Sequence, residues 1–292
     1  MKVAAIIVLY NPDEDGLLQL VNAVLQQADC LCLVDNATCH SASEIQNERV
    51  CYLNMGCNKG IAEAQNEAIR HILLKGNFDY ILFGDQDSMI PSGAVKRLQQ
   101  TFSALEEKGV KVGAVASKAY NKQTGTPYPY EPGGANQSVE ANVVEVSYAM
   151  NSISLFRTEY FRTVGLMDET LFIDGVDSEI CWRGTLQGYR FFVDERVRIA
   201  HQLGLGCKTI LGRELSISSP KRMFFQYRNY FILCRRKYTP VVWKRHNGCK
   251  YIIKLFFYPL FVSPRWEYIN NMARGIWAGV RNNRNIKNEK NI

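Results

Sequence analysis

The chain has 292 residues, of which 47% are hydrophobic and 22% charged, an ordinary composition for a globular protein. Its net charge of +7 is uneven, because residues 1–205 carry a net −8 and residues 206–292 a net +15. The nine cysteines include no CxxC pair and no zinc-finger spacing. They predict a reduced, cytoplasmic compartment in which most of them are small apolar residues.

Strand and helix patterns alternate along the first half of the chain. This alternation predicts an α/β fold with a doubly wound, mostly parallel sheet flanked by helices. We expect strands at 3–9, 30–34, 50–53, 80–83, 112–116, 147–156, 190–193 and 198–201, helices at 13–27, 61–74, 92–107, 176–187, 220–237 and 265–280, and a long loop at 121–142.

The predicted domains follow the change in charge. Residues 1–205 form the α/β domain, and residues 206–280 form a basic, aromatic and helical C-terminal extension. The polar end at 281–292 should be disordered. The first residues lead directly into a strand pattern, so we expect no cleavable signal sequence.

The most informative segment is the apolar strand Tyr80–Phe83, which continues as Gly84-Asp85-Gln86-Asp87-Ser88. Such a strand is typically buried in a parallel sheet, and ligands of these sheets bind outside the carboxyl ends of the strands. Two carboxylates one residue apart would repel an anionic ligand unless a divalent cation lay between them. The pattern suggests a metal-bridged diphosphate, although an isolated Asp-x-Asp is more often a solvated turn.

Two earlier strand ends should lie at the same edge of the sheet. The first strand ends in Tyr10-Asn11-Pro12 and the second in Asp35-Asn36. A carboxylate at Asp35 can accept hydrogen bonds from an imide N–H or a ribose hydroxyl, and it could equally cap a turn.

A loop rich in asparagine and glycine leads into the helix predicted at 61–74. It contains Asn54, Gly56, Asn58 and Gly60. Glycine permits close backbone approach, and a helix N-terminus favours an anion. The loop matches neither GxxxxGK[ST] nor GxGxxG, so a structural loop is the simpler interpretation when it is taken alone.

A third polar segment opens the helix predicted at 176–187. Asp177 stands at the expected start of this helix, where it could be a general base or a helix cap. Glu179 and Arg183 are four residues apart and should form a structural pair. His201 ends the last strand pattern, and a lone histidine is more often structural than a metal ligand.

Taken in order, these motifs resemble the family 2 glycosyltransferases of the GT-A fold, and among them the bacterial rhamnosyltransferases of O-antigen and other surface polysaccharides. The resemblance spans about residues 1–237 and includes Gln226-Tyr227-Arg228-Asn229. It implies an inverting, metal-dependent hexosyltransferase that moves a sugar from a nucleoside-diphosphate donor to a hydroxyl of a lipid-linked or growing surface glycan. L-Rhamnose from dTDP-rhamnose is the leading donor, with galactofuranose or a hexose as the alternative.

The resemblance also implies roles for single residues. Asp87 would be a direct ligand of a divalent metal, Mg²⁺ or Mn²⁺, and His201 would complete that site. The family's usual Glu-Asp is Val176-Asp177 here, so Asp177 takes the role of catalytic base and Asp174 is the runner-up. The donor nucleotide and diphosphate would be held by Tyr10, Asn11, Asp35, Asn36, Asn58, Gly60, Asp85 and Gln86.

The basic, aromatic C-terminal part suits either nucleic acid or an anionic membrane surface. Its longest apolar stretch, Tyr251–Val262, has about 12 residues, whereas a bilayer span needs roughly 20. We expect peripheral attachment to the cytoplasmic face of the membrane, with the run Arg235-Arg236-Lys237 taking part. A nucleic-acid-binding protein would leave the acidic strand ends unexplained. A nucleotidyltransferase would show a basic, glycine-rich phosphate loop near its N-terminus.

Overall fold

The computed structural model describes residues 1–37, 45, 47–122, 124–130, 138–150, 152–201, 207–210 and 213–281, with the backbone alone at 14, 15, 138, 139, 201, 207–210 and 213–216. The chain divides into two compact units. The first comprises residues 1–172 and 176–202, and the second comprises residues 173–175 and 203–292. Of the tail predicted to be disordered, all but Arg281 lies outside the described residues.

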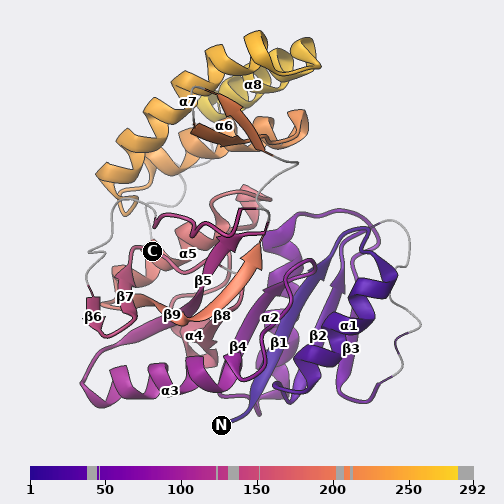
Figure 1. Cartoon of the computed structure of the whole chain (residues 1–292), viewed down its shortest axis with the longest axis vertical. Coiled ribbons are helices and arrows are strands. Elements are labelled where there is room, and N and C mark those ends of the chain that lie inside the picture. Colours follow the sequence, from indigo (N-terminus) through magenta and orange to yellow (C-terminus); the bar gives the residue numbers. More distant parts are fainter. Residues whose placement is uncertain are drawn as a thin grey trace. The chain divides into compact units, whose positions relative to one another are not determined.

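The first unit is built on one sheet in the order β3-β2-β1-β4-β8-β5-β9-β7-β6 (Figure 1). Within the described chain only β7 and β8 run against the other strands, so the sheet is mostly parallel, as predicted. The strands are β1 (Val3–Leu9), β2 (Cys30–Asp35), β3 (Val50–Asn54), β4 (Tyr80–Asp85), β5 (Val112–Asn121), β6 (Ser138–Glu140), β7 (Val143–Val146), β8 (Ser154–Arg157) and β9 (Arg190–His201).

Helices cover both faces of this sheet, which is why its strands are almost entirely apolar. Alternate residues of β1 point to opposite faces: Ala5, Ile7 and Leu9 join the core formed with α1 (Glu14–Leu25) and α3 (Ala94–Glu107). The other face carries α2 (Ile61–Lys75), α4 (Thr158–Thr163) and α5 (Val176–Thr185), with the short 3₁₀ helix η1 (Glu169–Leu171) before α5 (Figure 1).

The strand order reverses between β1 and β4, because β2 and β3 lie on one side of β1 and β4 lies on the other. Ligands of open α/β sheets bind outside the carboxyl ends of the strands at such a point. Leu9 pairs with Asp35 and Val8 pairs with Asp85. The three strands therefore end at the same edge, here called the strand-end rim.

The sequence patterns and the structure differ most around β9. The two strands predicted at 190–193 and 198–201 are one strand, because the polar residues between them are satisfied inside the unit. Asp194 is fully buried and accepts hydrogen bonds from Arg196 and from the Thr101 hydroxyl. The strand pattern at 147–156 becomes a strand only from Ser154, and β6 forms within the loop predicted at 121–142.

The second unit contains the hairpin β10 (Cys207–Ile210) and β11 (Arg213–Ser216) and the helices α6 (Pro220–Arg235), α7 (Val241–Phe261) and α8 (Arg265–Arg281). Its core is small and consists of Met223, Tyr227, Tyr258, Val262, Tyr268 and Met272. None of the described helices combines the length and the apolar composition that crossing a bilayer requires.

The helices α6 and α8 approach each other closely through two glycines of α8. A Cβ on Gly275 would lie 2.4 Å from the Phe224 carbonyl oxygen, so no larger residue fits there. Arg235 donates hydrogen bonds to the carbonyls of Gly279 and Val280, at 2.6 and 2.9 Å. Arg235, expected to face a membrane, thus has a structural role between α6 and α8.

Candidate active site

The end of β1 is fixed to the loop after β4 by one side chain. The Gln86 amide accepts a hydrogen bond from the Tyr10 backbone N–H at 2.7 Å and donates to the Tyr10 carbonyl at 3.2 Å. The Tyr10 side chain is 52% exposed, and Asn11 follows with a φ of 47°. Gln86 therefore positions the first strand end, and the Tyr10 ring remains available for contact with a flat ligand.

The end of β2 carries a buried carboxylate. Asp35 is fully buried, and it accepts hydrogen bonds from the Tyr52 hydroxyl at 2.6 Å and from the Ala37 backbone N–H at 3.1 Å. Burial and the neighbouring Asp35 raise the pKa of Tyr52 to about 12. The hydroxyl therefore stays protonated and keeps Asp35 in place.

The asparagine and glycine loop is hydrogen-bonded to Asn36, the residue that follows β2. The Asn36 side chain accepts from the Lys59 backbone N–H at 2.9 Å and donates to the Asn58 side chain at 3.2 Å. Asn58 also accepts from the Gly60 backbone N–H at 3.0 Å. Asn58 and Gly60, expected at the nucleotide, are thus bonded to Asn36 or to their own loop.

Gly60 brings the start of α2 against the segment that precedes α5. The Phe172 carbonyl accepts hydrogen bonds from the N–H groups of Ile61 at 2.7 Å and Ala62 at 3.4 Å. Gly60 has a φ of 88°, and a Cβ there would lie 2.6 Å from that carbonyl oxygen. A protein carbonyl thus takes the leading N–H groups of this helix, and the structural interpretation of the loop fits its geometry.

The two carboxylates after β4 have different surroundings. The Ser152 hydroxyl donates to Asp85, which is half-buried. Asp87 is exposed, with the Ser88 hydroxyl donating to it at 3.4 Å. Asp85 is therefore held by the protein while Asp87 faces outward. Nothing in the sequence around Ser152 signals this contact, because it joins residues 67 positions apart.

The loop containing Ser152 also reaches α5. A backbone group of Ala149 hydrogen-bonds the Cys181 thiol, and burial raises the pKa of that thiol well above its usual range. Asp177 is half-buried in the first turn of α5, one helical turn before Cys181. Ser152 is therefore bonded to the end of β4, and Ala149 to the helix that bears the predicted base.

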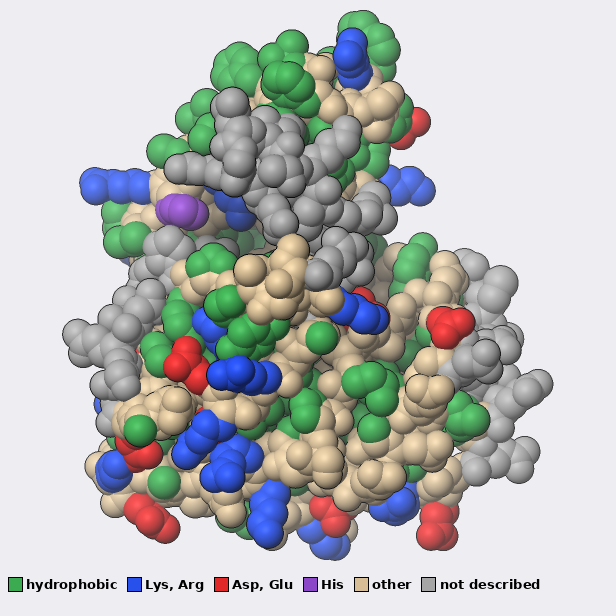
Figure 2. All heavy atoms as spheres, viewed as in Figure 1, with side chains coloured by type: hydrophobic (Ala, Val, Ile, Leu, Met, Phe, Trp, Pro, Cys, Tyr) green, Lys and Arg blue, Asp and Glu red, His purple; other side chains and the backbone are tan. Residues whose placement is uncertain are grey.

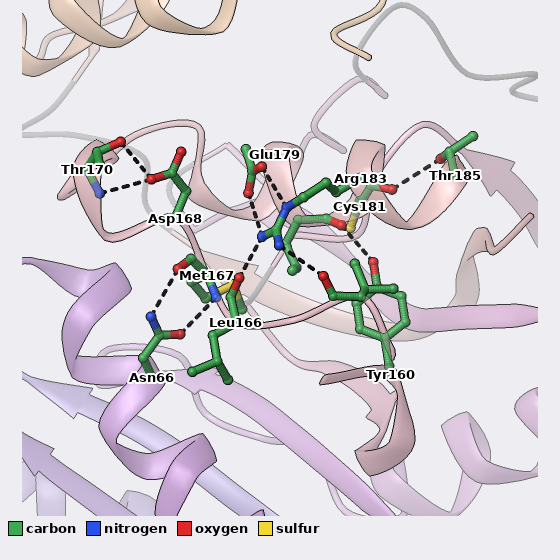
Figure 3. Close-up of polar contacts among 12 residues, drawn as sticks. Asn66, Tyr160, Leu166, Met167, Asp168, Thr170, Glu179, Cys181, Arg183 and Thr185 are labelled. Carbon is green, nitrogen blue, oxygen red and sulfur yellow. Dashed lines mark hydrogen bonds and ion pairs between the residues drawn. The ribbon is translucent and has the colours of Figure 1, made fainter. Parts of the chain in front are cut away.

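Figure 3 shows how α5 is anchored. Arg183 forms a two-point ion pair with Glu179 at 2.8 and 2.9 Å, which confirms the predicted structural pair. The same guanidinium donates to the carbonyls of Val164 and Leu166 at 3.0 and 2.6 Å. Glu179 is buried and committed to this pair, so it supports α5.

Asn66 of α2 anchors Met167, which lies in the segment between α4 and η1 (Figure 3). Its side chain accepts from the Met167 backbone N–H at 2.8 Å and donates to the Met167 carbonyl at 3.0 Å. Asn66 is the last residue of the asparagine and glycine motif, and its role in the fold explains its place there. Asn66 is buried, and its side chain is satisfied there by the N–H and the carbonyl of Met167.

Asp174 belongs to the second unit. The Arg222 guanidinium donates to its carboxylate at 2.8–3.1 Å. Asn229 donates to the carbonyls of Ile173 and Asp174 at 2.6 and 2.8 Å. The Asn229 of the Gln-Tyr-Arg-Asn motif therefore holds the 173–175 segment, and the runner-up base is engaged in an ion pair.

No group of three or more His, Cys, Asp or Glu side chains suited to a metal occurs in the part of the chain that is described. The backbone of His201 ends β9 opposite Asn121, and its side chain lies outside the described residues. Asp85 and Asp87 offer carboxylate oxygens, the ligands that Mg²⁺ and Mn²⁺ prefer. Two such residues fit a cation whose other ligands come from a diphosphate and water.

Comparison with known proteins identifies the family. Residues 4–165 match the model of "Glycosyl transferase family 2", which covers more than half of the chain. This chain belongs to glycosyl transferase family 2. The protein is also 28% identical over 290 residues to "dTDP-rhamnosyl transferase RfbF" of Shigella flexneri, across 96% of each chain.

Solved glycosyltransferases of the GT-A fold share the architecture of this family 2 enzyme. S. aureus TarS matches with a TM-score of 0.57 at 15% identity, over 95% of this chain and 49% of TarS. TarS 1–349 with UDP-GlcNAc gives 0.56 at 14% identity, over 95% and 81%. GalNAc-T7 with UDP, GalNAc and Mn²⁺ gives 0.55 at 12% identity, over 90% and 57%. This chain thus spans about half the length of the larger neighbours.

The family match covers the strand ends but stops before α5. It includes Tyr10, Asp35, Asp85 and Asp87, and it ends ahead of Asp177. Membership makes the protein a glycosyltransferase, so the nucleic-acid-binding and nucleotidyltransferase interpretations are set aside.

Proposed function

We propose that this glycosyltransferase is an inverting rhamnosyltransferase that moves L-rhamnose from dTDP-rhamnose to a hydroxyl of a lipid-linked or growing surface glycan. The observation that supports the site most strongly is the strand-end rim. It brings Tyr10, Asp35, Asp85 and Asp87 to one edge of the sheet where the strand order reverses. The donor is suggested by the full-length similarity to the rhamnosyl transferase of Shigella flexneri.

The first two strand ends would hold the nucleoside. The exposed Tyr10 ring offers a flat surface to the base, and Asn11 lies beside it. Asp35, which ends β2, could accept a hydrogen bond from an imide N–H or a ribose hydroxyl. Asn36 would line the same place, with Asn58 and Gly60 acting through it as positioning residues.

Asp87 would be the direct ligand of a divalent cation, with Asp85 behind it and His201 as a further ligand. When bound, the cation would neutralise the departing diphosphate. The Ser152 hydroxyl holds the Asp85 carboxylate in one orientation. The exposed position of Asp87 leaves its oxygens open to a ligand that arrives from solvent.

Asp177 would take the proton from the acceptor hydroxyl as its oxygen attacks the anomeric carbon, opposite the departing diphosphate. The proposal rests on its place at the start of α5 and on the tie between α5 and the loop that holds Asp85. The two carboxylates closest to Asp177 in the sequence form ion pairs: Asp174 pairs with Arg222, and Glu179 pairs with Arg183.

The acceptor would be presented at the cytoplasmic face of the membrane, where polysaccharide intermediates are carried on lipid diphosphates. The net +15 of residues 206–292 suits attraction to anionic lipid and to the phosphates of such a carrier. The protein would then act as a peripheral membrane enzyme.

A thermal-shift screen of nucleotide sugars tests the donor assignment. A ligand that binds only the native state stabilises it, by about 2.7 kcal/mol when the free ligand is at roughly 100 times Kd. We expect dTDP-rhamnose to raise the melting temperature more than UDP-GlcNAc or UDP-galactofuranose does, and to need Mn²⁺ or Mg²⁺. A larger shift with a UDP-sugar would assign another donor. No shift with any nucleotide sugar would overturn the proposed site.

A further inference from the structure

The exposed apolar surface of the second unit is concentrated on two helices. Eleven of the seventeen large apolar side chains that are exposed in the described chain lie between residues 241 and 280. Figure 2 shows hydrophobic side chains gathered over α7 and α8 in the upper part of the view, with Lys and Arg side chains beside them. A concentration of this kind marks an interaction surface.

Five exposed apolar residues of α7 lie along one side of the helix and are here called the α7 stripe; Val241, Val242, Leu255 and Phe261 are also exposed. The members of the stripe follow helical spacing, and at about 100° per residue they fall within roughly 100° of arc. The buried residues of this helix, Trp243, Asn247 and Tyr258, fall on the opposite side. The helix thus has one face in the unit and one apolar face turned to its surroundings. The α7 stripe consists of Cys249, Ile252, Ile253, Phe256 and Leu260.

Positive charges lie at both ends of the α7 stripe. Arg245 lies before the stripe in the sequence, Lys250 lies next to Cys249, and Arg265 follows the stripe. All three are exposed. Glu267 is the one carboxylate between positions 217 and 281 of the sequence. An apolar stripe with cations around it has the composition of a helix that lies in the interface of an anionic bilayer.

We propose that the α7 stripe is an insertion face for an anionic lipid bilayer, and that α7 lies in the plane of the membrane. The inference deepens the peripheral membrane location proposed above and names the residues that enter the lipid. The stripe would be buried about 5–10 Å into the boundary between headgroups and acyl chains, while the cations contact the headgroups.

A second copy of this chain suits the same face less well. Two stripes packed on each other would bring Arg245, Lys250 and Arg265 of both copies together, with little negative charge to oppose them. Like charges across an interface are unfavourable, whereas an anionic bilayer supplies the opposite charge over the whole surface.

Sedimentation with vesicles tests the proposal on the full-length protein. The probes are vesicles of phosphatidylcholine alone and of phosphatidylcholine with phosphatidylglycerol. The wild type should bind the anionic vesicles, and Ile253→Glu with Phe256→Glu should weaken this binding roughly tenfold or more, since each change removes a large apolar group from the lipid. Replacing Lys250 and Arg245 with Gln should weaken binding at low salt and have little effect at high salt.

A matched control uses two apolar residues of the first unit that are at least as exposed as Ile253 and Phe256. Leu74 is 88% exposed and Leu186 is 69% exposed. Leu74→Glu with Leu186→Glu makes the same change in charge and polarity and should leave vesicle binding at the wild-type level. If the control pair weakens binding as much as the α7 pair, the α7 stripe is not the insertion face. If the α7 pair unfolds the protein, Ile253→Ser with Phe256→Ser repeats the comparison without added charge.

Two further measurements separate the other outcomes. Trp266 is 82% exposed and follows the α7 stripe, so brominated anionic lipids should quench its fluorescence, and Trp266→Phe should remove that quenching.

If the α7 pair instead converts a dimer to a monomer without changing vesicle binding, a second copy occupies the face. Binding of dTDP-rhamnose by the α7 pair should be unchanged. If no variant binds dTDP-rhamnose but vesicle binding still follows the stripe, the donor assignment fails and this inference stands.

Discussion

The two units of this protein use charge and apolar surface in opposite ways. In the first unit the apolar side chains fill a core between sheet and helices, and the carboxylates of the rim lie at strand ends. In the described part of the second unit a core of six buried residues holds three helices together, and much apolar surface on α7 and α8 is left exposed between cations. Chemistry needs groups held in one place, and strand ends of a covered sheet provide that. Contact with a lipid surface needs only a helix with one face left unburied.

The largest effect that sharpens this comparison concerns the two aspartates near the start of α5, which belong to different units. Asp177→Asn should lower the rate of rhamnose transfer roughly 10²–10⁴-fold, because the amide cannot accept the proton, while dTDP-rhamnose binding is kept. The rate is measured as incorporation of labelled rhamnose into the lipid extract of membranes, and binding is measured by calorimetry.

Asp174→Asn is the matched control for that change. It should mainly weaken the pair with Arg222, at a cost of up to about 1 kcal/mol of stability because that arginine is substantially exposed. An active Asp177→Asn protein together with an inactive Asp174→Asn protein would reverse the assignment of the base.

The next effect concerns the stability of the first unit at the close approach between Gly60 and Phe172. Gly60→Ala should lower the free energy of unfolding by roughly 2–3 kcal/mol, since the new Cβ must displace Phe172 and the residue must also keep a positive φ. Gly56→Ala has a similar φ of 71° with nothing within 4 Å of the new Cβ, so it should cost only about 1 kcal/mol. Urea unfolding measures both. Equal costs would show that the approach to Phe172 does not constrain this loop.

A smaller effect concerns the second unit. Burial, with help from Lys250 and Arg222 and against the pull of Asp174, lowers the pKa of Lys254 from 10.5 to about 8. Between these two values the unfolded chain binds more protons than the native one, so this group makes stability rise with pH across that window. At pH 7 its native charge is an unfavourable term, and Lys254→Met should stabilise the protein by about 1 kcal/mol.

The advantage of Lys254→Met should shrink as the pH rises through 8 towards 10.5, because the wild-type lysine then loses its charge. Melting temperatures of both proteins across this range provide the check. A pH-independent difference would mean that packing, rather than the buried charge, sets the effect. Loss of stability at every pH would mean that the 2.9 Å bond from Lys254 to Gln226 outweighs the cost of burial.

The sequence predicted the sheet and the rim well because both depend on local patterns. Apolar strands end in polar turns at Asn11, Asp35 and Asp85, and parallel strands align their carboxyl ends without further information. The continuous strand β9 was not predicted, because the buried Asp194 and its exposed partner Arg196 look like a break in an apolar pattern.

Contacts between residues far apart in the chain could not be predicted from the sequence either. The bond from Ser152 to Asp85, the pair of Arg222 with Asp174 and the tie of Arg235 to α8 each join residues more than 40 positions apart. The composition indicated a basic, aromatic extension, but only the packing of α7 shows which of its faces is exposed.

The measurement that tests the central claim most directly is calorimetric binding of dTDP-rhamnose in the presence of Mn²⁺ by the wild type, by Asp87→Asn and by Glu107→Gln. Glu107 is an exposed carboxylate at the end of α3, so its replacement makes the same change in charge away from the strand-end rim. We predict that Asp87→Asn weakens binding by at least roughly 10–100-fold and that Glu107→Gln has no effect, since losing even an outer-shell partner of a metal costs that much. Equal affinity of all three proteins for dTDP-rhamnose would contradict a donor site at this rim.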